Sequence, residues 1–375
     1  MSKRAICLFL LIVSSAAAQI PPRWAAKAAK DWYGRQPWLV GSNYIPSYAI
    51  NQLEMWQAET FDPARIDKEL GWAEGIGLNT MRVFLHDLLW QQDAAGFKQR
   101  IREFLKIADK HHMRIMFVLF DSCWDPSPQL GPQRAPRNGV HNSGWVQGPG
   151  AKALADPEQT QRLLAYVKDI VGDFSRDDRI LAWDLWNEPE NMNPGSYDKQ
   201  EPANKAELVA ALLPKVFRAA REALPTQPLT SAVYQGDWSD PETLSPIQRI
   251  QLDQSDVLSF HNYGTPREFE ACIRSLKGYK RPIICTEYMA RTNGSTFQGI
   301  LPIARKEEVA AYNWGLVKGK TQTWLPWNSW EHPYTTSGPP SWFHDIFTTE
   351  GAPYSQREVD FIHEMLNGKK LRKAS

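Results

Sequence analysis

Short apolar runs alternate along the chain with longer stretches in which apolar residues recur every three or four positions. The short runs are typical of strands buried on both faces of a parallel sheet, and the longer stretches are typical of amphipathic helices. Strands are therefore predicted over residues 38–46, 80–86, 114–120, 180–187, 228–234, 257–263, 282–288 and 321–328. Helices are predicted over residues 63–76, 95–112, 157–175, 204–224, 266–279, 303–318 and 356–367, with a weaker helical pattern over 240–254.

This alternation of eight strands with helices predicts an α/β protein built as a single (β/α)8 TIM barrel. No change in composition along the 375 residues marks a linker between two domains. A doubly wound open sheet is the structural alternative. Such a sheet more often carries a glycine-rich first turn, and no Gly-x-Gly-x-x-Gly occurs in this chain.

Two predicted connections are long for a compact domain, namely residues 121–156 after the third strand and 329–354 after the eighth. Each contains two tryptophans, which are rare in disordered linkers. In a TIM barrel these connections lie at the carboxyl ends of the strands, where active sites are assembled. We therefore expect a cleft walled by aromatic loops.

The amino-terminal residues have the three parts of a secretory signal peptide. Lys3 and Arg4 form a basic start, an apolar run follows, and three alanines ending at Ala18 suit a cleavage site. The apolar run is too short to span a bilayer permanently. The chain is therefore divided into a signal peptide, 1–18, and one mature domain, 19–375, which is expected to be secreted or periplasmic and to have no membrane partner.

The composition is that of a soluble globular protein without a polyanionic partner. The formal net charge is +1 at pH 7, which lacks the basic excess of a nucleic-acid binder. The 16 tryptophans suit stacking on neutral sugar faces, although Trp also fills protein cores. We expect an oligosaccharide or polysaccharide as the partner, no nucleic acid, and a monomeric protein.

Removal of the signal peptide leaves Cys123, Cys272 and Cys285, which can form at most one disulfide bridge. Cys285 lies in an apolar strand run and Cys272 in a helical pattern, so the thiols are expected to be free and mainly buried. No Cys/His spacing resembles a zinc site, and no Walker phosphate loop occurs. The sequence therefore predicts no cofactor and no bound metal.

The fourth predicted strand leads into the stretch Trp-Asp-Leu-Trp-Asn-Glu-Pro. Pro189 has no N–H to donate to a neighbouring strand, so it ends the strand and places Asn187 and Glu188 at the sheet edge. The indoles of Trp183 and Trp186 are expected to leave the Glu188 carboxyl poorly solvated and to raise its pKa. A raised pKa suits a general acid that works near neutral pH.

Polar residues also stand at the carboxyl ends of other predicted strands, which meet at one mouth in a TIM barrel. Each has an ordinary structural explanation by itself, because a strand-end histidine is more often a hydrogen-bonding residue than a catalyst. As a set, two carboxylates three strands apart, flanked by Arg, His, Tyr, Asn and Trp, match what glycoside hydrolysis requires. The candidates are Arg82, His86, Asp121, Asn187, Glu188, His261, Tyr263, Glu287 and Trp327.

Trp-Asn-Glu-Pro at the fourth strand and Cys-Thr-Glu-Tyr at the seventh resemble the motifs of the cellulase-type glycoside hydrolases of family 5. The resemblance extends over the whole mature chain in the order of its elements. It implies membership of the clan of (β/α)8 retaining enzymes with catalytic glutamates on strands four and seven. The implied activity is hydrolysis of β-linked glycans by double displacement, as in cellulases, mannanases and xylanases.

The resemblance further implies roles for individual residues. Glu188 is implied as the acid/base and Glu287 as the nucleophile, which Arg82 and Tyr263 would position and tune. Asn187 would hold the sugar 2-hydroxyl. The other implied or candidate substrate-binding residues are His261 at the catalytic subsite, Trp327 as the platform under the sugar with Trp324 or Trp330 as alternatives, His86, Asp121, and Asn43, which could instead only close the barrel.

Elementary electrostatics supports the same division between the two glutamates. Glu287 must be ionised to attack an anomeric carbon, and Arg82 and Tyr263 are residue types that lower a carboxyl pKa. Asp184 is a charged residue inside an apolar strand, so we expect it to pair with Arg82 beneath the site.

Two other functions fit part of the pattern. A catalytically silent carbohydrate-binding barrel could keep the aromatic cleft, although the presence of both glutamates argues against it. A metal-dependent hydrolase could use His86, Asp121, His261 and Glu287, but no His-x-His cluster supports it. The sequence leaves open the sugar backbone, the linkage, and whether cleavage is internal or terminal.

The amino-terminal pattern makes one prediction that can be tested directly. We expect the exported protein to begin at Gln19, because the small-residue site precedes it. Amino-terminal sequencing of material from the medium or periplasm measures this, and an exported chain that still begins at Met1 would contradict it.

Overall fold

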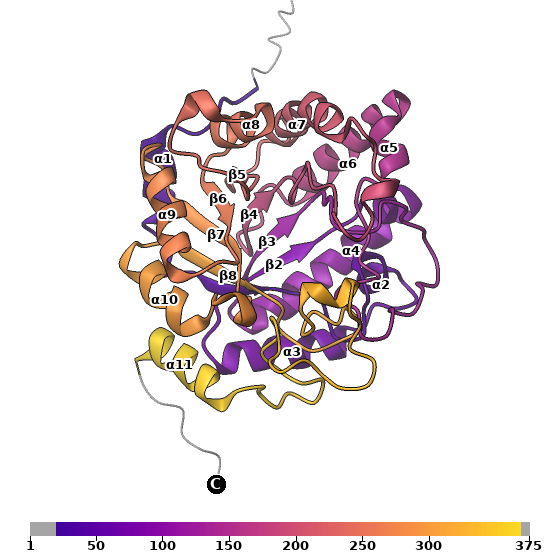
Figure 1. The fold of residues 1–375 in the computed structure, drawn as a ribbon. Helices are drawn as coiled ribbons and strands as arrows, with labels where there is room; N and C mark the ends of the chain where they lie inside the picture. Colours follow the sequence, from indigo (N-terminus) through magenta and orange to yellow (C-terminus); the bar gives the residue numbers. More distant parts are fainter. Residues whose placement is uncertain (1–19, 369–375) are drawn as a thin grey trace, which may run out of the picture.

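The computed structural model describes residues 20–368, in which eight parallel strands form a barrel (Figure 1). Neighbouring strands follow the order β5-β4-β3-β2-β1-β8-β7-β6. Val233, just after β5, makes a parallel bridge to Phe260 of β6 and so completes the ring. The strands are β1 (Val40–Asn43), β2 (Thr80–Phe84), β3 (Arg114–Val118), β4 (Ile180–Asp184), β5 (Leu229–Thr230), β6 (Leu258–His261), β7 (Ile283–Tyr288) and β8 (Ala310–Trp314).

Helices surround the strands on the outside of the barrel, which confirms the predicted (β/α)8 TIM barrel (Figure 1). The long helices are amphipathic, and their apolar faces are buried against the strands. They are α1 (Ala26–Tyr33), α2 (Gln52–Trp56), α3 (Pro63–Gly75), α4 (Asp87–Lys110), α5 (Ala151–Ala155), α6 (Thr160–Asp173), α7 (Lys205–Glu222), α8 (Pro246–Gln254), α9 (Pro266–Lys277), α10 (Phe297–Lys306) and α11 (Gln356–Asn367).

The amino end of the barrel is closed by α1, which precedes the first strand. Ala29 and Trp32 of this helix belong to one buried cluster with residues at the starts of the strands, among them Leu39, Leu181 and Val257. The opposite, carboxyl end is therefore the open mouth of the barrel, where the strand-end side chains lie.

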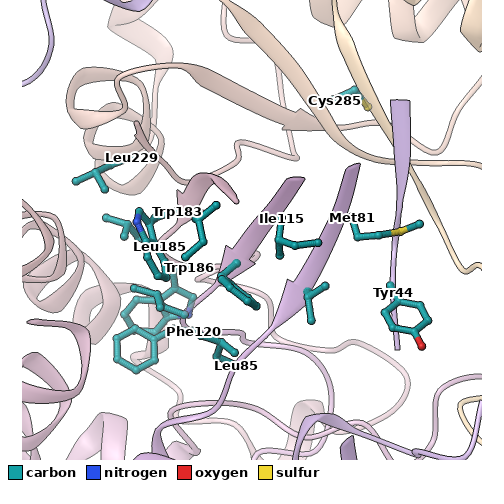
Figure 2. Packing of buried hydrophobic residues seen from close by; sticks show 14 of the residues in the cluster. Tyr44, Met81, Leu85, Ile115, Phe120, Trp183, Leu185, Trp186, Leu229 and Cys285 are labelled. Atoms are coloured by element: carbon teal, nitrogen blue, oxygen red, sulfur yellow. The ribbon is translucent and has the colours of Figure 1, made fainter. Parts of the chain in front are cut away.

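Near the carboxyl end of β4, alternation along the strand separates an apolar side chain on the outside from a polar one on the inside. Trp183 of β4 and Trp186 after it lie in the main core, where the ring of Trp186 is 5.2 Å from that of Phe120 (Figure 2). Burying such a side chain stabilises the fold by about 1.5–3 kcal/mol. Asp184, the neighbour of Trp183, is fully buried in the barrel interior, so β4 anchors the outer core and supplies the site at once.

The eighth strand does not lie where the sequence pattern predicted it. Residues 321–328 belong to a loop, and β8 is the short run Ala310–Trp314, which the pattern assigned to a helix over 303–318. The helix there, α10, ends at Lys306. The error has a physical cause, because Ala-Ala-Tyr-Asn-Trp continues a helical apolar period, whereas the Thr, Trp and Leu of the loop mimic a buried strand.

Both long connections exist, with bounds that differ from the predicted ones. The β3–α5 loop spans residues 119–150, and two bridges, Asp121–Gly148 and Asp125–Val146, hold its two arms together. The β8–α11 loop spans residues 315–355 and is longer than predicted because β8 ends earlier. Both loops rise from the carboxyl end of the barrel.

The predicted signal peptide, 1–18, lies outside the described residues. Within residues 20–368, no helix is both long enough and apolar enough to cross a membrane.

Gly41 of β1 offers a direct test of the barrel register. A Cβ at this position would lie 2.0 Å from the backbone oxygen of Thr80 in β2. We expect Gly41→Ala to destabilise the fold by on the order of 1–3 kcal/mol, as overpacking of a core does. Gly75, which ends α3 and has no atom within 4 Å of a built Cβ, is the control.

For Gly75→Ala the expected change is less than about 1 kcal/mol, in the stabilising direction. Denaturant unfolding of both variants measures the two effects. Equal stabilities for the two variants would show that β1 and β2 are not packed in this register.

Candidate active site

A single guanidinium organises the mouth of the barrel. Arg82 of β2 is fully buried, and its Nη1 donates hydrogen bonds to Asn43 Oδ1 at 2.7 Å and Glu287 Oε1 at 2.8 Å. Its Nη2 donates to Asn187 Oδ1 at 2.7 Å. Nε and Nη2 both donate to Asp184 Oδ2, at 3.0 and 2.8 Å. Arg82 thereby connects residues of β1, β4 and β7 with Asn187, which follows β4.

The predicted pairing of Asp184 with Arg82 is confirmed. Both side chains are fully buried, so each charge would be costly without the other. Asp184 holds one edge of the guanidinium and leaves Nη1 directed at Glu287. The ion pair therefore supports the site from beneath.

Glu287 is held by both of its carboxylate oxygens. Oε1 accepts from Arg82, and Oε2 accepts from the Tyr263 hydroxyl at 2.6 Å. Tyr263 comes two residues after the end of β6, beside β7 in the barrel, which explains its reach. The carboxylate is thus fixed in one orientation within a buried setting.

Glu188 is held by a different set of partners. Its Oε1 lies 2.9 Å from His261 Nδ1, and its Oε2 accepts from Asn191 Nδ2 at 2.7 Å and from the Cys123 thiol at 3.3 Å. The backbone φ of Glu188 is 42°, in the left-handed region that side chains rarely adopt. Such a residue costs on the order of 1–3 kcal/mol and is most common at functional sites.

The two glutamates share a histidine. One carboxylate oxygen of Glu188, one of Glu287 and one ring nitrogen of His261 all lie within 4.8 Å of one another. His261 Nδ1 is 3.5 Å from Glu287 Oε2 as well as 2.9 Å from Glu188 Oε1. The Nε2 atom of the same ring is buried and has no hydrogen-bond partner. His261 is only 3% exposed and is not among the residues that line the cavity above the pair.

The pKa directions differ from the sequence-based expectation. Burial raises the pKa of Glu188, but hydrogen bonds with His261, Cys123 and Asn191 outweigh it and hold that pKa below its ordinary value. Burial raises the pKa of Glu287 by more than the charges of His261 and Arg82 lower it. The prediction of a raised pKa for Glu188 is therefore wrong for the substrate-free site.

The cause lies in the two indoles. Trp183 and Trp186, which were expected to desolvate Glu188, are turned into the outer core, where they donate to Gln227 Oε1 and Ser122 Oγ. The neighbours of the carboxyl are instead polar hydrogen-bond donors.

A buried ion pair fixes the loop that carries Asn191. Lys205 Nζ, at the start of α7, donates to Glu201 Oε2 at 2.9 Å and to the Asn191 backbone oxygen at 2.6 Å. Glu201 Oε1 in turn accepts from Asn193 Nδ2 at 2.6 Å. Both charged side chains are fully buried. They therefore set the position of the amide that holds Glu188.

A cavity of about 370 Å³ opens above this cluster. Its lining comes from the loops after β3, β4, β5, β6 and β8, with the strand-end carboxylates at its base. The residues that line it are Cys123, Trp124, His141, Asn142, Asn187, Glu188, Asn191, Asn193, Pro194, Tyr234, Gln235, Tyr263, Glu287, Trp314, Trp327 and His344.

Residues 74–333, which are more than half of the chain, match the cellulase family, glycosyl hydrolase family 5. The chain belongs to this family. It is a glycoside hydrolase, and the resemblance seen in its strand-four and strand-seven motifs is confirmed. The comparison with curated protein sequences finds no match.

Solved structures share the fold of this family 5 chain at low sequence identity. An exo-β-1,4-mannosidase from Opitutaceae bacterium strain TAV5 has 18% identity and a TM-score of 0.57, over 88% of this chain and 59% of that one. GH5_18 from Streptomyces cattleya, in complex with Manβ1-4GlcNAc, has 13% identity and a TM-score of 0.57, over 88% and 80%. The endo-β-1,4-mannanase from Thermotoga petrophila has 12% identity and a TM-score of 0.56, over 91% and 80%.

The similarity at these identities shows the fold alone. The chain spans 59% of the length of the Opitutaceae mannosidase.

The aromatic residue at the end of the eighth strand is Trp314, which the sequence analysis missed. The predicted eighth strand, 321–328, indicated Trp324, Trp327 and Trp330 instead. Trp314 lines the cavity and follows Asn313 at the strand end, so the short Tyr-Asn-Trp run was the feature that could have revealed it. Trp327 lines the cavity from the β8–α11 loop and is 37% exposed.

Trp324 and Trp330 are not among the cavity-lining residues. Trp324 is packed against Trp342, with Lys318 Nζ over its ring. Trp330 is stacked on Trp124 in the second layer of the wall. The structure thus separates the three aromatic candidates that the sequence could not distinguish.

His86 and Asp121 lie beneath the cavity surface and do not line it. His86 caps α4: its Nδ1 accepts from the Leu88 N–H, and its Nε2 lies 2.9 Å from the Gln147 carbonyl. Asp121 accepts from Asn187 Nδ2 at 2.9 Å and from Trp145 Nε1 at 2.6 Å. Burial raises the pKa of Asp121 to about 7.

Asn43 does not line the cavity either. Its Oδ1 accepts from Arg82, and its Nδ2 donates to the backbone oxygen of Thr286 in β7. The barrel-closing role considered for Asn43 thus agrees with its contacts, whereas Asp121 orients Asn187.

The described cysteines are all free, as predicted. Cys285 is buried, whereas Cys123 and Cys272 are only partly buried. Burial raises the pKa of the Cys123 thiol well above its ordinary value, and the nearby carboxylate of Glu188 adds to this. Cys123 is therefore a hydrogen-bond donor to Glu188 and a poor nucleophile.

The candidate metal ligands are not brought together as a set. Within residues 20–368, the group of three or more His, Cys, Asp or Glu side chains with a suitable spacing is Glu188, His261 and Glu287, without His86 or Asp121. Glu287 already receives a cationic partner and a hydroxyl hydrogen bond. These contacts do not fit a resident metal ion at the site.

Asn191 provides a test of the electrostatics around Glu188. Its amide stabilises the ionised carboxylate, so Asn191→Ala should raise the pKa of Glu188. If Glu188 must be protonated to act as an acid, the high-pH limb of the kcat/KM profile moves to higher pH. The pH profile with an aryl glycoside that needs leaving-group protonation measures the shift.

Met192, the exposed neighbour, supplies the control. Met192→Ala should leave the high-pH limb of the kcat/KM profile at the same pH as in the unmodified protein. A limb that moves to lower pH in Asn191→Ala would show that the amide does not act on this carboxyl.

Proposed function

We propose that the protein is a secreted, monomeric, retaining β-glycosidase with Glu188 as acid/base and Glu287 as nucleophile. The observation that carries the proposal is the proximity of the two carboxylates, since one oxygen of Glu188 lies within 4.8 Å of one oxygen of Glu287. Retaining glycosidases place their carboxyl groups about 5–5.5 Å apart, whereas inverting enzymes need about 6.5–9.5 Å to admit a water. A direct attack on the sugar is the mechanism that fits this distance.

The partners of Glu287 suit a nucleophile. Arg82 and Tyr263 hold its two oxygens and present the carboxylate to one point above the barrel. Burial raises the pKa of this carboxyl, and the guanidinium at 2.8 Å offsets part of that effect and so favours the negative charge that the attack needs. In the covalent intermediate one oxygen is bound to the sugar, and the other keeps its hydrogen bond.

The partners of Glu188 suit a group that exchanges a proton. His261 lies between the two carboxylates, so a change of charge on either one is felt by the other. When Glu287 loses its charge by bonding to the sugar, the repulsion that it exerts on an ionised Glu188 disappears. Glu188 is then suited to act as a base toward the water that hydrolyses the intermediate.

Trp314 is proposed as the platform under the sugar at the cleavage point. Its ring is packed edge-on against Phe84 and Trp145, at 5.7 and 5.8 Å between centroids, which fixes its plane. Trp327 is packed edge-on against Tyr263 at 5.1 Å and borders the mouth. Asn187 is fixed between Arg82 and Asp121 at the base of the cavity and is the candidate for the sugar 2-hydroxyl.

β-Linked mannosides are the first substrates to test. The solved structures with the same fold include an exo-β-1,4-mannosidase and an endo-β-1,4-mannanase, and one holds Manβ1-4GlcNAc. Glucosides and xylosides follow, since the family 5 name covers cellulases and the cavity residues do not by themselves select a sugar.

The two glutamates should fail in different ways when they are removed. Glu287→Ala should lose turnover on every substrate, because Thr286 and Tyr288 flank it and offer no carboxylate in its place. Azide should restore a product of the opposite anomeric configuration. Glu188→Ala should lose about 10²–10⁴-fold on substrates that need leaving-group protonation, and azide should rescue it with retained configuration.

Time-resolved NMR of the first-formed anomer is the direct measurement for the unmodified protein. A retained anomer is expected. An inverted product would overturn the double-displacement assignment, and unaltered hydrolysis by Glu287→Ala would remove that residue from the mechanism.

A further inference from the structure

The two long loops at the mouth of the barrel are joined to each other. Asn142 N donates to the Thr321 carbonyl at 2.7 Å, and Tyr334 N donates to the Gly139 carbonyl at 2.9 Å. These backbone bonds connect the β3–α5 loop, 119–150, to the β8–α11 loop, 315–355. Because β1 and β2 lie between β8 and β3 in the barrel, the joined loops pass over that side of the mouth.

Side chains strengthen the junction. His141 N donates to Ser329 Oγ at 2.8 Å, and His141 Nδ1 lies 2.7 Å from the Leu325 carbonyl. The Trp124 and Trp330 rings are stacked with centroids 5.7 Å apart, one from each loop. We call the joined segment, residues 139–142 with 321–334, the loop bridge.

The loop bridge forms a closed wall of the cavity. His141 and Asn142 line the cavity, although they are only 2% and 1% exposed. His344, beside His141 with ring centroids 5.4 Å apart, lines it at 1% exposure. His141, Asn142 and His344 are therefore covered on this side of the cavity, and Trp327, which belongs to the same bridge, is the exposed residue at its rim.

Where the loops after β4 and β5 line the cavity, it is open to solvent. Pro194 after β4 and Gln235 after β5 line it and are exposed. A chain of sugars can therefore leave the cavity across the β4 and β5 loops, and it meets a wall on the side of β1 and β2.

The catalytic pair fixes which part of a substrate lies on which side. In the proposed function the sugar whose anomeric carbon meets Glu287 lies over Trp314, which is at the end of β8 and in register with Asn43 of β1. Behind Trp314 the remaining space is about 10 Å³, enough for about one water and not for a sugar. The leaving group then extends past Glu188 toward the open side.

We propose that the loop bridge restricts the enzyme to the non-reducing end of its substrate, so that it removes one terminal sugar per cycle. This inference rests on the proposed function. On this proposal one sugar occupies the space between the catalytic pair and the wall, and the rest of the chain is the leaving group. The fold neighbours do not decide the matter, because they include an exo-acting mannosidase and an endo-acting mannanase.

Each cycle consumes one water. The bond between the terminal anomeric carbon and the glycosidic oxygen breaks, Glu188 gives its proton to that oxygen, and Glu287 bonds to the carbon. Water then replaces Glu287 at the carbon and returns a proton to Glu188. The products are one monosaccharide and a chain shorter by one sugar.

Two chromogenic substrates separate this inference from the proposed function. The unmodified protein is given the 4-nitrophenyl β-monosaccharide and the 4-nitrophenyl β-1,4-disaccharide of mannose, glucose and xylose. We expect immediate release of nitrophenol from the monosaccharide of one sugar. From its disaccharide we expect a lag, since a terminal sugar must be removed first, and only single sugars as products.

Other outcomes have distinct meanings. Release of an intact disaccharide without a lag overturns the terminal restriction while it supports a glycosidase. Failure on all six substrates overturns the proposed function and the inference with it.

Variants of the wall test its cause. His141→Ala should raise the rate of intact disaccharide release, relative to monosaccharide hydrolysis, at least tenfold. Leu130→Ala, an exposed change elsewhere in the same loop, should leave the ratio unaltered. An unchanged ratio in a folded His141→Ala protein would assign the restriction to another part of the cavity, and the two-substrate test stands if this variant does not fold.

Discussion

The site depends on a guanidinium that has been taken out of water and divided among four acceptors. A buried charge of this kind is tolerated only when its hydrogen bonds are complete, and loss of one partner of a buried ion pair typically costs about 3–5 kcal/mol. Arg82 satisfies this condition by joining Asp184, Glu287, Asn43 and Asn187. The hydrogen bonds that satisfy the buried Arg82 therefore hold three strands of the barrel together and also orient Glu287.

The strand pattern and the buried motifs made most of this architecture predictable. Asp184 had to find a cation because an apolar strand surrounds it, and the parallel barrel offered Arg82 at the same depth. The proximity of Glu188 and Glu287 was predictable because strands four and seven end at one mouth. The bounds of β1 to β7 also agree with the apolar runs, shortened at their ends.

The rest could not be obtained from local pattern. β8 has only five residues, and Ala310 and Ala311 by themselves favour a helix. They form a strand here because β8 pairs with β1 on one side and β7 on the other. Its misplacement hid Trp314. The donors to Glu188 were equally inaccessible, because Cys123, Asn191 and His261 come from three separate loops or strands that only the fold brings together. The lowered pKa of Glu188 follows from these three donors, and the adjacent tryptophans do not determine it.

The cap formed by α1 has a practical meaning for the use of this enzyme. Arg23 and Trp24, just before the helix, are tied to Ser255 and Asp256 at the start of β6, so the chain enters the molecule on the face opposite the cavity. A surface anchor or a fused partner attached ahead of residue 20 would consequently sit behind the barrel. Immobilised in that way, the molecule would present the mouth of its barrel to solution.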